Sequence, residues 1–109
     1  MSIRPIANEQ IERLLVGVPT GHQHIRAALQ LQGETLLLQE ATIANLCRAY
    51  LRVSTEPRPG ARAVELRADA GSSRRAGFAP HQLLETDRPG GEVADELARL
   101  LERGGLPAA

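Results

Sequence analysis

A glycine at position 33 separates two apolar segments and thereby limits the folds that the chain can adopt. Over residues 25–32, apolar side chains alternate with polar ones, a pattern typical of a half-buried strand. The segment 36–38 is apolar again, beyond Gly33-Glu34. A two-residue loop that begins with glycine is typical of a type II′ turn, so we expect a β-hairpin here.

This turn would place Leu31 opposite Leu36 and Leu29 opposite Leu38 in the hairpin. Because side chains alternate between the two faces of a strand, all four leucines would share one face, which we expect to be the core side. Leu37 falls on the other face, which is mostly polar and could meet solvent or a partner.

Three segments have the periodicity of amphipathic helices: residues 7–17, 41–54 and 92–103. In the second of them, one apolar stripe runs along the helix and consists of Ile43, Leu46, Cys47, Tyr50 and Leu51. We expect this stripe to pack on the leucines of the hairpin and to complete the core. The third helix should end at Gly104, since glycine commonly follows the last turn of a helix.

Residues 62–68 alternate in polarity and predict a third strand, and Leu83 and Leu84 could form a short extended piece. The resulting order is α-β-β-α-β-α. It predicts the α+β class, with a small, mostly antiparallel sheet of three to four strands covered on one face by about three helices. A length of 109 residues suits a single domain over 1–109, with a disordered tail at 105–109.

The composition points to a cytoplasmic protein. No apolar run approaches the roughly 20 residues that cross a bilayer, and the first residues lack the apolar core of a signal peptide. The chain has one cysteine, Cys47, so no disulfide can form within it, as is usual in a reducing compartment. We therefore expect the chain to have no membrane association.

All thirteen basic residues are arginine, which together with abundant alanine indicates a GC-rich bacterial genome. The absence of lysine excludes Schiff-base chemistry, a pyridoxal-phosphate anchor and a P-loop lysine. Only two aromatic residues, Tyr50 and Phe78, are present, too few for a platform on which single-stranded bases stack.

His22 and His24 form a His-x-His pair. On a strand the two imidazoles would point to the same side, a geometry that could hold a divalent metal. A metal site needs a third ligand, which could come from His81 or from a carboxylate of Glu34, Glu40 or Asp87. The simpler interpretation is that both histidines belong to the polar face of the strand.

Cys47 and Tyr50 both lie within the apolar stripe of 41–54. This position predicts that the Cys47 thiol is a buried packing group rather than a reactive one. Tyr50 is likewise expected to be a core residue whose hydroxyl reaches the edge of the core.

Four arginines could form an anion-binding patch: Arg48, Arg52, Arg74 and Arg75. Guanidinium groups bind carboxylates and phosphates through paired hydrogen bonds, so an anion or a nucleic-acid backbone is one candidate ligand. The net charge of zero argues against a nucleic-acid partner, since most such binders are strongly basic. Pairing of these arginines with acidic residues of the same or another subunit is the simpler interpretation.

These observations favour a non-catalytic interaction or accessory module. A small sheet with open edges would be protected by pairing with a second copy, so we expect a homo-oligomer, most simply a homodimer. No catalytic residues are assigned, since the sequence contains no Gly-x-Ser-x-Gly, Cys-x-x-Cys or His-Glu-x-x-His motif. A protein that binds a metal or small ligand through His22 and His24, and an anion or nucleic-acid binder, are the alternatives.

Overall fold

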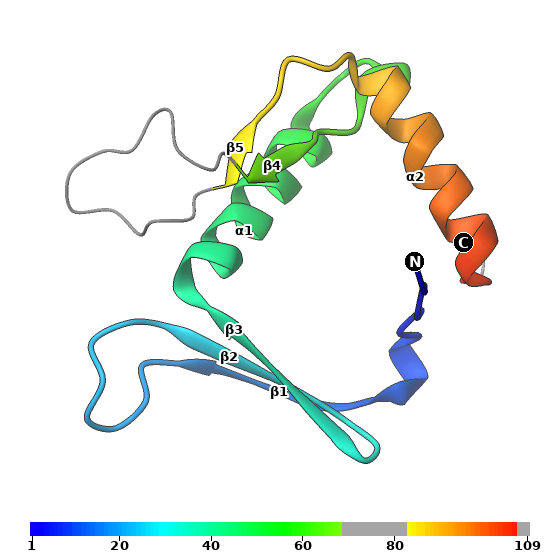
Figure 1. Ribbon diagram of the computed structural model, residues 1–109. Coiled ribbons are helices and arrows are strands. Elements are labelled where there is room, and N and C mark those ends of the chain that lie inside the picture. Colours follow the sequence, from blue (N-terminus) through cyan, green and yellow to red (C-terminus); the bar gives the residue numbers. More distant parts are fainter. Residues whose placement is uncertain (69–82, 107–109) are drawn as a thin grey trace. The chain divides into compact units, whose positions relative to one another are not determined.

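The computed structural model describes residues 1–68 and 83–106. Within these residues the order of the main elements is β-β-β-α-β-β-α (Figure 1). The elements are β1 (Ile11–Gly17), β2 (Arg26–Leu31), β3 (Glu34–Gln39), α1 (Glu40–Thr55), β4 (Leu66–Ala68), β5 (Leu83–Glu85) and α2 (Gly90–Gly104). They form two compact units, Met1–Ala44 with Ala98–Ala109, and Asn45–Leu97.

The fold is mixed α/β, with a three-stranded antiparallel sheet, a two-stranded sheet and two α-helices among the described residues. The prediction of a mixed fold with antiparallel strands is thus confirmed, whereas the count of three helices is wrong. None of the helices described here has the length and apolar character needed to cross a membrane. The single domain over 1–109 stays a prediction.

The first unit contains the predicted hairpin as the pair β2 and β3, and β1 lies along the other edge of β2 (Figure 1). The register differs from the predicted one, since Leu29 faces Leu36 and Leu31 faces Glu34. The loop consists of Gln32 and Gly33, because the backbone at its second position has a φ of 81°, which favours glycine.

Moving the loop by one residue shifts the pairing of the two strands by two positions, so each residue keeps its face. Leu29 and Leu31 therefore still share a face with Leu36 and Leu38, as the alternation predicts. Leu31 is buried, and Leu37 on the opposite face is exposed.

The helix predicted at 7–17 is wrong, since Ile11–Gly17 forms strand β1. In β1, Leu14 lies opposite Leu29 and Val16 lies opposite Ala27. A short isolated helix is marginal in water, whereas pairing with β2 satisfies the backbone of this segment along one edge. A short 3-10 helix at Asn8–Gln10 precedes the strand.

In the second unit, the strand predicted at 62–68 is confirmed only for Leu66–Ala68. This strand, β4, pairs with β5 rather than with the hairpin, and the extended piece expected at Leu83 and Leu84 belongs to β5. The loop predicted at 69–77 lies outside the described residues.

Helix α2 confirms the helix predicted at 92–103 and is longer by a few residues. Gly104 ends it, and Gly105 follows with a φ of 74°, a left-handed conformation typical of glycine after a helix. The backbone amides of Gly105 and Leu106 donate to the carbonyl oxygen of Leu101 at 2.9 and 3.3 Å. The first two residues of the predicted disordered tail therefore cap α2.

Candidate functional site

Helix α1 is confirmed, and part of the side next to its apolar stripe is covered within the second unit. Asn45 is buried, and Ala49 and Val53, one and two turns further on, are half-buried. The Asn45 side-chain oxygen accepts a 2.6 Å hydrogen bond from Nη2 of Arg48, which satisfies this buried polar group. The covered side of α1 is therefore a row of small or polar residues.

The apolar stripe of α1 is distinct from that row, and its predicted packing on the leucines of the hairpin stays a prediction. Leu46, Tyr50 and Leu51 are 58%, 72% and 61% exposed. Arg52 of α1 forms an ion pair with Glu85 of β5.

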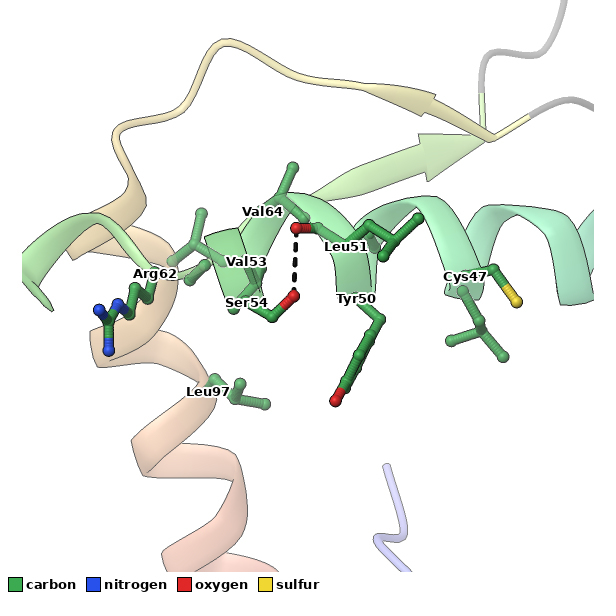
Figure 2. A pocket seen from close by; sticks show the side chains of 12 residues that line it. Cys47, Tyr50, Leu51, Val53, Ser54, Arg62, Val64 and Leu97 are labelled. Atoms are coloured by element: carbon green, nitrogen blue, oxygen red, sulfur yellow. Dashed lines mark hydrogen bonds between the residues drawn. The ribbon is translucent and has the colours of Figure 1, made fainter. Parts of the chain in front are cut away.

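The exposed stripe forms one wall of a groove that lies wholly within the second unit and has a volume of about 800 Å³ (Figure 2). Residues 62–64 and the first half of α2 complete the lining. Figure 2 shows Tyr50 and Leu97 projecting into the same space from α1 and α2. The lining is almost wholly apolar, so the groove is suited to burying an apolar surface.

Two polar groups of the groove lining have backbone partners within the second unit. The Ser54 hydroxyl donates to the carbonyl oxygen of Leu51 at 3.2 Å, and Nε of Arg62 donates to the carbonyl oxygen of Glu56 at 2.8 Å. The lining thus combines these paired groups with mostly apolar side chains from α1 and α2.

Cys47 lies on the groove wall and is exposed, so its predicted burial is wrong. Tyr50 is exposed beside it rather than buried in a core. Both residues lie within the stripe that the periodicity identified, and both errors therefore have the same origin, namely the side of α1 that faces outward.

An ionic cluster centred on Arg88 fixes the start of α2 in the second unit. Nη1 of Arg88 donates to Oε2 of Glu65 at 2.8 Å and to Oε1 of Glu96 at 2.7 Å. The Thr86 hydroxyl donates to Oε1 of Glu65 at 3.0 Å. The hydrogen bond from Arg88 is the main cause that lowers the pKa of Glu65, and the hydrogen bonds to Glu96 and then to Glu65 raise the pKa of Arg88.

Two glycines let α2 begin close against the short 3-10 helix at Pro59–Ala61. A Cβ built on Gly90 would lie 2.6 Å from the carbonyl oxygen of Ala61, and one on Gly91 would lie 3.2 Å from that of Gly60. Together with the Arg88 cluster, this contact sets where Val93 and Leu97 stand in the groove.

The histidine pair lies in the loop between β1 and β2 rather than on a strand. His24 contacts Glu40 at 3.2 Å from Nδ1 to Oε2, and Glu34 is held by Arg4, whose Nη1 lies 2.6 Å from Oε2. Within residues 1–68 and 83–106, no group of three or more metal-ligating side chains is formed. Asp87 lies exposed just before Arg88, and His81 lies outside the described residues.

The structure brings Arg48 and Arg52 to one side of α1, opposite the apolar stripe, each with an intramolecular partner. Those partners are Asn45 and Glu85. Arg74 and Arg75 lie outside the described residues, so the four-residue patch stays a prediction.

The groove was not predicted from the sequence. Apolar residues at helical spacing usually belong to a core, and the stripe of α1 was therefore interpreted as a core face. A signal was present in the row of Asn45, Ala49 and Val53, a second face of α1 that is compatible with burial.

Comparison of the chain with protein-family models, with curated proteins and with solved structures finds no match.

Proposed function

We propose that the chain is a non-catalytic interaction module that acts as a homo-oligomer, most simply a dimer, and that the groove of the second unit is its contact surface. One observation carries the proposal: α1 covers its row of small residues and leaves its leucine stripe exposed. Large apolar patches on a soluble chain mark sites of association.

The size of the exposed surface supports this interpretation. Leu46, Tyr50, Leu51 and Leu97 are each at least half exposed. Together they present on the order of 400 Å² of mainly apolar surface, about half of what each partner contributes to a standard interface.

The ionic groups support a structural rather than a catalytic role. Arg52 pairs with Glu85, and Arg88 pairs with Glu65 and Glu96. Structural ion-pair networks shift pKa values much as active sites do, so the lowered pKa of Glu65 is accounted for by its partners. The single cysteine fits the cytoplasmic location that we propose.

Light scattering on three versions of the full chain at micromolar concentration tests the proposal. We expect a discrete oligomer for the unaltered chain and a monomer for Leu46→Asp, because a carboxylate in the groove must be desolvated on association. Leu37→Asp is the matched control, since Leu37 is a leucine at least as exposed but lies on the hairpin. A shift of Leu37→Asp alone to monomer would reject the groove as the contact surface.

A further inference from the structure

We draw no further inference here: the strongest candidate, the apolar groove that α1 and the first half of α2 line in the second unit, carries nothing beyond the proposed function, because nothing in the structure shows what covers it.

Discussion

Arg88 donates a 2.8 Å hydrogen bond from Nη1 to Oε2 of Glu65, joining the residue just before β4 to the segment that leads into α2. The two residues are 23 positions apart in sequence, and both side chains are mostly covered. The contact holds two walls of the groove, residues 62–64 and the start of α2, in one arrangement. The contact therefore positions the apolar surface of the groove.

The Arg88–Glu65 pair should make stability depend on pH in the acid range. Because the pKa of Glu65 is lower in the folded chain than its usual value, its contribution is present above about pH 4.3 and is lost as the pH falls through the lowered pKa. We expect Glu65→Gln to unfold at a lower temperature at neutral pH and to lose less stability on acidification than the unaltered chain. Thermal unfolding between about pH 5 and pH 2 measures how strongly the stability of the unaltered chain and of Glu65→Gln depends on pH.

Glu9→Gln serves as the control for this titration, since Glu9 is exposed in the first unit. Glu56 also has a lowered pKa through its hydrogen bonds with Arg58, so some acid sensitivity should remain in Glu65→Gln. Equal acid slopes for the unaltered chain and Glu65→Gln would contradict the role assigned to the Arg88 contact.

The close approach of Gly90 to Ala61 should make position 90 intolerant of a side chain. Gly90→Ala puts a methyl group 2.6 Å from a backbone oxygen, and forcing such contacts typically costs about 1–3 kcal/mol. Gly60→Ala is the matched control, because a Cβ there meets nothing within 4 Å. Urea unfolding of both variants measures the difference, and equal stabilities would show that α2 does not start against this backbone.

The alternation of the hairpin should be visible in stability. Leu31 is 9% exposed, so Leu31→Ala should lower the free energy of unfolding by about 2–4 kcal/mol through lost burial and the cavity left behind. Leu37→Ala, on the opposite face at 76% exposure, should change it by no more than about 0.5 kcal/mol. Chemical denaturation of both variants measures the two losses in the free energy of unfolding. A larger loss for Leu37→Ala than for Leu31→Ala would show that the face of Leu37, and not that of Leu31, is the buried one.

The histidine pair allows a direct test of the metal alternative. His22 and His24 lie in an exposed loop, and Glu40 already contacts His24 and accepts from the backbone amide of Ile25 at 3.2 Å. We therefore expect added Zn²⁺ to leave the unfolding temperature of the untagged chain unchanged. A rise in the unaltered chain that disappears in the His22→Ala/His24→Ala double variant would instead support a metal site.

The sequence predicts those elements whose signals are local. The hairpin follows from the alternation around Gly33, and α1 and α2 follow from apolar residues at helical spacing. The segment at β1 was misassigned because Ile11, Leu14 and Leu15 fit one face of a helix as well as they fit a strand. Pairing with β2, across a loop of several residues, favours the strand over the helix. This contact is not local in sequence, so the pattern of residues 11–17 alone does not indicate it.

The candidate site shows a different limit of sequence reasoning. Periodicity identifies Leu46, Cys47, Tyr50 and Leu51 as one apolar side of α1, but it does not say what that side faces. The burial of Asn45 was not anticipated, because a polar residue is covered only where a partner such as Arg48 satisfies it. The same apolar pattern on a helix is compatible with a face in the core and with a face in a protein–protein interface.

Sedimentation equilibrium of the unaltered full chain over a dilution series tests the central claim most directly, namely that the exposed leucine stripe of α1 is covered by a second copy. We expect a mass of twice 11.8 kDa at micromolar concentration, falling toward a single chain only on strong dilution. A mass of 11.8 kDa throughout the series would contradict the account.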